Sequence, residues 1–294
     1  MTPPDLLPFW QRTRGELQQT PLHATLTSAP EHSGREYVTS AVTLHSFQGT
    51  RLRAWYSVPT DLPRGGTVPA VLAVPGYGGD KPIPTHLVMQ GFAVLTLYPR
   101  GQGESQQEWT LEHSTKLTYH VTDKARFYYR GCYMDCVRGL DFLAARPEID
   151  VTRLGMWSRS QGGGLTLATA ALDSRVRVAV AEEPFLCNYP LAMTLTSRPY
   201  VELSDYVAAH PEHKPGMLET LAYFDTLHLA PQIQCPTLVN IGMCDAVCPA
   251  ATILPMFERI TAPKALHVYP DLTHRPCADF NAHALHWLQR YLGA

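Results

Sequence analysis

The chain has 294 residues, 45% of them hydrophobic, and this length is sufficient to bury a large core in a single α/β domain. Its 24 lysines and arginines are balanced by 26 acidic residues, and no basic run is interleaved with aromatic residues, which argues against nucleic-acid binding. No segment approaches the roughly 18 uninterrupted apolar residues of a membrane span, and the first residues do not have the pattern of a secretory signal. We therefore expect a cytoplasmic protein with neither a membrane nor a nucleic-acid partner.

Eight apolar or alternating segments rich in β-branched and aromatic residues are typical of strands. In chain order they cover residues 37–47, 51–58, 70–74, 92–98, 154–158, 176–181, 237–241 and 266–269. The first two are predicted to form a hairpin around Gln48, Gly49 and Thr50. The later strands alternate with stretches of helical period, which predicts a mostly parallel sheet with helices on both faces.

Helices are indicated by the spacing of apolar residues between the strands. One stripe is formed by Tyr133, Val137, Leu140 and Leu143, a second helix begins at Gln161, and a third covers about 278–292.

Segment 185–234 is longer than a connection between parallel strands requires, and we expect helices of its own near Pro199 and over 217–224. We interpret 185–234 as a cap-like insertion in a single domain, 1–294, which lines a pocket at the carboxyl edge of the sheet. The alternative is an insertion that covers the core and does nothing more.

Seven cysteines are present, and an odd number without a signal peptide favours reduced thiols over a disulfide framework. The pairs Cys132/Cys136 and Cys244/Cys248 have three intervening residues, whereas zinc motifs commonly have two or add nearby histidines. We interpret Cys132 and Cys136 as small apolar residues on one helix face, and we expect neither a metal nor an organic cofactor.

Ser160 lies where a predicted strand joins a predicted helix through a glycine-rich turn. Ser158 and Gly162 provide small residues two positions before and after it, which is the spacing of a nucleophile elbow. A plain glycine-rich turn or a phosphate cradle is the alternative interpretation, although the Lys-Ser/Thr pair of a Walker motif is missing.

A serine hydroxyl is a weak nucleophile at neutral pH and needs a base, which in turn is held in the right tautomer by a carboxylate. Asp245 follows strand 237–241 and His274 follows strand 266–269, in the order Ser, Asp, His of an α/β-hydrolase. Among 13 histidines, His274 is favoured because it lies on the loop after the last strand. Asp271 is the second candidate for the acid.

The intermediate of acyl transfer carries a negative oxygen that needs preorganised donors. We expect one donor to be the backbone N–H of Gln161, directly after the serine. The other is expected from the loop 75–79 that follows strand 70–74, where Tyr77 is the favoured residue. The alternative for this loop is an ordinary tight turn.

Taken together and in this order, the motifs resemble the acetyl xylan esterase and cephalosporin C deacetylase family of α/β-hydrolases from about Val42 to the C-terminus. The matching pieces are residues 76–78, 100–103, 128–130, 160–164, 184–187 and 223–225, and Asp245 with Cys248 and Pro249. The resemblance implies a serine deacetylase of acetylated sugars and cephalosporins whose triad maps onto Ser160, His274 and Asp245. It also implies oxyanion donors at Tyr77 and Gln161 and a supporting role for Arg100 and Gln102.

The chain departs from the family pattern at three places. Ser158 and Arg159 replace two glycines before the nucleophile, and Arg275 follows the histidine where the family has Glu. The stretch from Glu104 to Phe127 is shorter than the insertion that builds the family's ring-shaped hexamer. A homo-oligomer is possible, but the sequence does not decide the oligomeric state. Two other functions also stay open: a serine hydrolase of the peptidase or dienelactone type, and a catalytically silent hydrolase fold that binds a partner.

Overall fold

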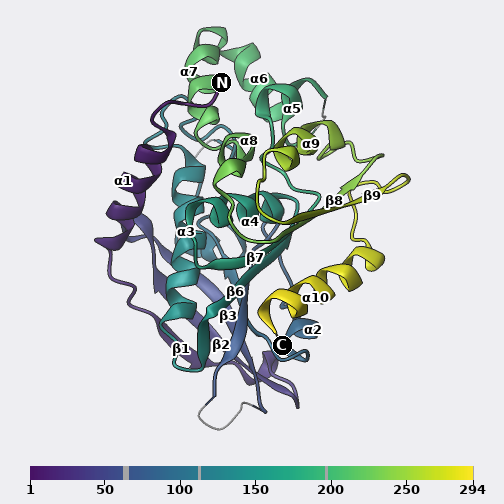
Figure 1. Ribbon diagram of the computed structural model, residues 1–294. Helices are drawn as coiled ribbons and strands as arrows, with labels where there is room; N and C mark the ends of the chain where they lie inside the picture. Colours follow the sequence, from purple (N-terminus) through teal and green to yellow (C-terminus); the bar gives the residue numbers. More distant parts are fainter. Residues whose placement is uncertain (62–65, 112–113, 196–197, 294) are drawn as a thin grey trace.

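A computed structural model of the protein describes residues 1–61, 66–111, 114–195 and 198–293 (Figure 1). Nine strands form one sheet in the order β1-β2-β3-β5-β4-β6-β7-β8-β9. The strands are β1 Thr25–Ser28, β2 Tyr37–His45, β3 Arg51–Pro59, β4 Val68–Ala73, β5 Ala93–Tyr98, β6 Ile149–Arg159, β7 Val176–Glu182, β8 Thr237–Gly242 and β9 Lys264–Tyr269. β1, β2, β3 and β5 pair antiparallel in turn, and every pair from β5 to β9 is parallel, which confirms the mostly parallel sheet.

The central strands are apolar on both faces, which is why their sequences read as continuous hydrophobic runs. In β4, Ala70 and Leu72 belong to one core cluster, whereas Val71 and Ala73 belong to the other. The two clusters are the two faces of the sheet, and each is covered by helices.

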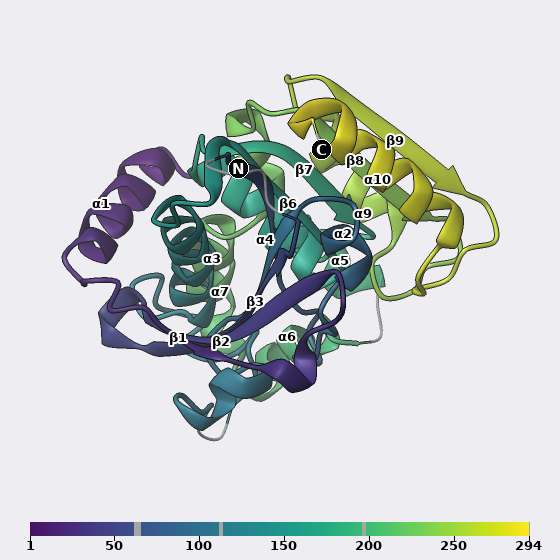
Figure 2. The same ribbon diagram turned by 90° about the horizontal axis from the view of Figure 1, so that it is seen from below.

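The helices of the described chain are α1 Leu6–Gln18, α2 Thr85–Val88, α3 Tyr128–Ala144, α4 Gln161–Leu172, α5 Tyr189–Leu195, α6 Val201–Ala209, α7 Lys214–Ala222, α8 Thr226–Leu229, α9 Ala250–Glu258 and α10 Ala278–Leu292. α1, α3, α4 and α9 contribute buried residues to the first core cluster, and α2 and α10 contribute to the second. Figure 2 shows α1 and α3 well separated from α10, with the sheet between them. Among the described residues, no helix has the length and apolar character needed to cross a membrane.

The hairpin between β2 and β3 turns where the sequence predicts it. Gln48 and Gly49 have φ angles of 59° and 74°, a left-handed conformation that glycine adopts without steric cost. The predicted stripe on α3 is also confirmed, and Cys132 and Cys136 are buried on that helix as small apolar residues.

Segment 185–234 contains α5, α6, α7 and α8 together with two short 3-10 helices, Pro211–His213 and Ala230–Gln232. α6 and α7 are the two helices expected from the apolar spacing, and Phe224 lies just beyond the end of α7. In Figure 1 the helices α5, α6 and α7 gather at the top of the view, at the opposite end from β1 and β2.

Candidate active site

Ser160 occupies a strained turn between β6 and α4. Its φ and ψ angles are 58° and −125°, a conformation that is costly for a residue with a side chain. The turn is fixed on both sides by the end of β7: the Ser160 N–H donates to the carbonyl of Glu182 at 2.8 Å, and the Phe185 N–H donates to the carbonyl of Ser160 at 2.9 Å. This is the geometry of a nucleophile elbow.

The glycines after Ser160 are required by close packing. A Cβ added at Gly162 would lie 2.7 Å from Cβ of Ser158, and one at Gly164 would lie 2.1 Å from the carbonyl oxygen of Phe185. The Ser158 side chain fits at this position because its buried hydroxyl accepts from the Val74 N–H at 2.9 Å.

Three predicted residues from distant parts of the chain meet at the carboxyl edge of the sheet. Oγ of Ser160 lies 3.0 Å from Nε2 of His274, and Nδ1 of His274 lies 2.8 Å from Oδ2 of Asp245. Ser160 follows β6, Asp245 follows β8 and His274 follows β9, so the parallel strands deliver all three to one edge.

The Asp245 carboxylate is held by backbone donors as well as by the histidine. Its Oδ1 accepts from the N–H groups of Val247 and Cys248, both at 2.8 Å, and the residue is buried. Asp271, the second candidate, is exposed on the loop after β9.

A second buried carboxylate, from Glu183, also approaches the histidine. Its Oε2 lies 3.4 Å from Nδ1 of His274 and 3.7 Å from Nη1 of Arg159. Neither oxygen accepts a hydrogen bond from the residues that the structure describes. Burial raises the pKa of Glu183 to about 8, against the opposing charge of Arg159 and with help from the negative charge of Asp245.

Glu183 was not predicted from the sequence. Two acidic residues directly after a buried strand, Glu182 and Glu183, were the available signal, because that strand ends at the same edge as the serine. The guanidinium of Arg159 lies 3.7 Å from this carboxyl group, and its positive charge opposes the rise in the pKa of Glu183.

The loop after β4 lies against the serine. A Cβ added at Gly76 would be 3.8 Å from Cβ of Ser160. The Gly76 carbonyl accepts from Nε2 of Gln102 at 3.0 Å, Oε1 of Gln102 accepts from Nε2 of Gln161 at 2.9 Å, and Oε1 of Gln161 accepts from the Tyr129 hydroxyl at 2.9 Å. This chain of hydrogen bonds fixes the Gly76 loop relative to the first residue of α4.

The Tyr77 side chain forms a hydrogen bond with segment 185–234. Its hydroxyl donates to Oε2 of Glu202 on α6 at 2.6 Å, and its backbone carbonyl accepts from Nζ of Lys116 at 2.9 Å. Burial raises the pKa of the Tyr77 phenol, and the bond to Glu202 adds to the shift. Tyr77 therefore links the loop after β4 to segment 185–234.

Arg100 lies behind the site rather than in it. Its Nε and Nη2 donate to the two oxygens of Asp135 on α3, each at 2.8 Å, and Nη2 also donates to the carbonyl of Phe47 at 3.0 Å. Both charged side chains are buried. The Arg100 guanidinium packs so closely over Gly131 that a Cβ there would lie 2.3 Å from it.

A cavity of about 770 Å³ opens over Ser160 and His274. Segment 185–234 contributes Arg198, Pro199 and Glu202 to its lining. The lining also includes a charged cluster that the sequence did not reveal, in which Lys81 and Arg159 lie near Glu182. Glu182 accepts a hydrogen bond from the indole N–H of Trp157, and burial lowers the pKa of the Lys81 amine.

Comparison with known proteins places this geometry among acetyl esterases. The chain matches the family model of acetyl xylan esterases (AXE1) over residues 1–291. It is 28% identical to the acetyl esterase Axe7A of Xylanibacter ruminicola in an alignment of 309 positions, which covers 98% of this chain and 67% of the relative.

Two solved structures are similar over nearly their whole length. The acetyl xylan esterase from Paenibacillus sp. R4 has a TM-score of 0.93 at 30% identity, covering 99% of this chain and 96% of the other. Acetyl xylan esterase 1 from Thermoanaerobacterium sp. JW/SL YS485 has a TM-score of 0.91 at 27% identity, covering 100% and 95%.

The mostly parallel sheet and the helices on its two faces define an α/β-hydrolase. Within that class, the chain belongs to the acetyl xylan esterase family. It is accordingly a carboxylic ester hydrolase that acts on a small-molecule ester.

Proposed function

We propose that Ser160 is the nucleophile of an acetyl esterase, with His274 as its base and Asp245 as the carboxylate that orients the base. The observation that carries this proposal is the continuous contact from Ser160 Oγ to His274 Nε2 at 3.0 Å and from His274 Nδ1 to Asp245 Oδ2 at 2.8 Å. When Nδ1 carries its proton toward Asp245, Nε2 is free to accept the serine proton.

In the first step, Ser160 Oγ attacks the acetyl carbonyl carbon while its proton moves to Nε2 of His274. The resulting oxyanion is stabilised by the backbone N–H groups of Gln161 and Tyr77. The hydrogen bonds that join Gln161 to Gln102, and Gln102 to the Gly76 carbonyl, support this role because they hold the two donor segments together. Arg100 supports the site indirectly, because it binds Asp135 on α3 and Tyr129 of the same helix donates to Gln161.

The tetrahedral intermediate then collapses. The C–O bond to the alcohol breaks, the alcohol leaves with the proton from His274, and an acetyl group remains bonded to Ser160. A water molecule, deprotonated by His274, attacks this acyl-enzyme and releases acetate.

The substrate that we propose is an acetylated sugar, such as acetylated xylan or xylo-oligosaccharides, or an acetyl ester of the cephalosporin C type. A cavity of about 770 Å³ is larger than an acetyl group requires, so most of it is available to the alcohol part of the ester. We further propose that 185–234 is a cap within a single domain, because its Arg198, Pro199 and Glu202 line the cavity.

Replacement of the nucleophile tests the mechanism. Ser160→Ala is expected to remain folded and to lose hydrolysis of p-nitrophenyl acetate, whereas Ser158→Ala should retain a large part of it. A fluorophosphonate probe should label the unaltered chain at Ser160 and leave the Ser160→Ala variant unlabelled. Turnover by Ser160→Ala at the unaltered rate would refute the assignment.

A substrate panel tests the acyl and alcohol preferences separately. Preference for the acyl group is measured by the rates of hydrolysis of acetyl, butyryl and longer p-nitrophenyl esters, amides and lactones. Preference for the alcohol is measured with acetylated xylo-oligosaccharides and cephalosporin C. A preference for amides or lactones over acetyl esters would favour a peptidase or dienelactone-type activity instead.

Two further predictions concern the setting of the enzyme. All seven cysteines are free thiols, which fits the cytoplasmic location that we propose. Light scattering after size-exclusion chromatography would show whether the chain is a monomer or a homo-oligomer.

A further inference from the structure

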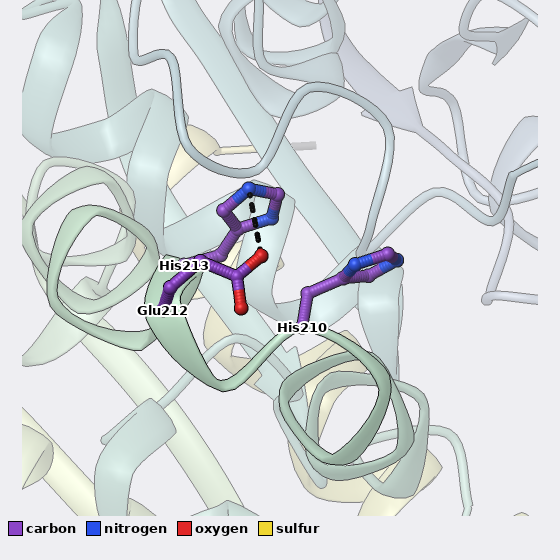
Figure 3. Close-up of side chains that lie close together, drawn as sticks. All are labelled: His210, Glu212 and His213. Atoms are coloured by element: carbon purple, nitrogen blue, oxygen red, sulfur yellow. Dashed lines mark ion pairs between the residues drawn. The ribbon is translucent and has the colours of Figure 1, made fainter.

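Three potential metal ligands lie together at the turn between α6 and α7, and none of them belongs to the proposed triad or to the cavity lining. His210 directly follows α6, and Glu212 and His213 belong to the 3-10 helix Pro211–His213 that leads into α7. Figure 3 shows the three side chains projecting to the same side of this turn. One ligand atom from each residue lies within 4.8 Å of the other two.

The geometry points to a binding site for Zn²⁺ or a similar transition-metal ion, formed by His210, Glu212 and His213. Nε2 of His213 and Oε1 of Glu212 are 3.5 Å apart. Two ligand atoms bound to a tetrahedral zinc ion at its usual bond lengths are about 3.4 Å apart, so this pair needs almost no rearrangement. The exposed His210 side chain can supply the third ligand by a small rotation, and water completes the coordination.

A hydrogen bond behind His213 selects the nitrogen that faces the ion. Nδ1 of His213 lies 2.8 Å from the Tyr206 hydroxyl oxygen. When Nδ1 donates its proton to that oxygen, Nε2 presents its lone pair toward Glu212. Zinc-bound histidines are usually oriented in this way by a partner on the other ring nitrogen.

The rest of the turn also favours a cation. The rings of His210 and His213 are nearly parallel, with an interplanar angle of 24° and centroids 5.1 Å apart, so the two imidazoles lie close enough to share one ion. His210 follows the last residue of α6, where the helix carbonyls attract positive charge. One divalent ion at this turn would be coordinated by both imidazoles.

A bound ion would stabilise the turn at one end of α6, while Glu202 in the first turn of the same helix accepts from Tyr77 at the other end. Metal binding would therefore restrain both ends of a helix that borders the ester-binding cavity. The inference concerns a site outside the proposed triad, and its test does not depend on esterase activity.

The test is titration of the chelator-treated full-length chain with Zn²⁺ by isothermal calorimetry at pH 7.5. We expect His210→Ala and His213→Ala each to weaken one zinc equivalent by about a hundredfold or more, and Tyr206→Phe to weaken it by about 10- to 100-fold. Because imidazoles protonate at low pH, the same equivalent should bind at least tenfold more weakly at pH 5. Mg²⁺, which prefers oxygen ligands, should not compete.

Two control variants make the outcome decisive. His286→Ala removes an exposed histidine of α10 that belongs to none of the identified ligand groups, and His283→Ala disrupts a second group, His267, Asp279 and His283. Both should retain the zinc equivalent of the unaltered chain. Unchanged zinc affinity in His213→Ala, loss of the equivalent in His283→Ala instead, or equal competition by Mg²⁺ would overturn the proposal.

Discussion

Oε2 of Glu183 lies 3.4 Å from Nδ1 of His274, the same nitrogen that Asp245 approaches at 2.8 Å. Two buried carboxylates therefore face one imidazole. Two negative charges are unfavourable in so little space, and Glu183, whose pKa burial raises to about 8, is the one that keeps its proton at neutral pH.

We expect Glu183 to make the stability of the protein decrease as the pH rises. The unfolded chain releases this proton near pH 4.5, whereas the folded chain keeps it up to about pH 8, so the unfolded state binds fewer protons between these values. Relative to Glu183→Gln, the free energy of unfolding should fall at up to about 1.4 kcal/mol per pH unit within that window. Urea denaturation of both proteins from pH 5 to 9 measures the difference.

Glu258→Gln is the matched control because Glu258 is exposed at the end of α9. Its stability difference from the unaltered chain should stay nearly constant over the same pH range. A Glu183→Gln difference that is equally flat would show that the buried carboxyl does not titrate as described.

Asp245→Asn is expected to reduce kcat by about 10⁴-fold, because the amide no longer holds His274 in the tautomer that accepts the serine proton. Steady-state hydrolysis of p-nitrophenyl acetate measures the effect. Asp271→Asn should retain the unaltered kcat, since Asp271 is exposed. The reverse ranking of the two variants would make Asp271 the acid.

Gln102→Ala is expected to lower kcat by about 10- to 100-fold with little change in KM, because the Gly76 loop loses the bond that fixes it relative to α4. Such a split indicates a donor that acts mainly in the transition state. Gln107→Ala, which removes an exposed glutamine at the end of the 3-10 helix Gly103–Gln107, is the control. A rise in KM with unchanged kcat would instead assign Gln102 to substrate binding.

Arg100→Ala is expected to lower the free energy of unfolding by about 3–5 kcal/mol, because it leaves the Asp135 carboxylate buried without its counter-charge. Arg51→Ala removes an arginine whose ion pair with Glu108 is half exposed, and should cost at most about 1 kcal/mol. Chemical denaturation compares the two variants. Equal losses would show that burial does not strengthen the role of Arg100.

The fold and the meeting of Ser160, Asp245 and His274 could be predicted because each depends on local sequence. Each buried strand has a recognisable apolar run, and in a parallel sheet the residues that follow such strands meet at one edge. The choice of Asp245 over Asp271 needed only the order of the elements. The eight predicted strands all lie at or close to their observed positions.

Elements without a distinct pattern were not predicted. All four residues of β1 are exposed at the edge of the sheet, so no alternation marks it. α9 contains Pro255 in its interior, which reads as a helix breaker, and its apolar residues follow the Asp245 loop without a clear start. α1 did carry an amphipathic signal, since Leu6, Phe9, Trp10, Thr13 and Leu17 are buried at helical spacing.

Side-chain pairings across the site were beyond the reach of the sequence. The contact of Glu183 with His274, and that of Tyr77 with Glu202, join segments separated by 91 and 125 positions. Whether such carboxylates are buried depends on how distant segments pack together, and no local sequence motif determines this packing.

The N–H and the carbonyl of Ser160 both form hydrogen bonds with the backbone at the end of β7 and just beyond it, at Glu182 and Phe185. The position of the reactive atom is thus set by main-chain hydrogen bonds, and the hydroxyl itself contributes little to the shape of the turn. A cysteine in place of Ser160 should consequently fit without a change in the backbone. Its thiol would lie next to the same His274 imidazole. The same backbone could therefore position another nucleophilic side chain next to His274.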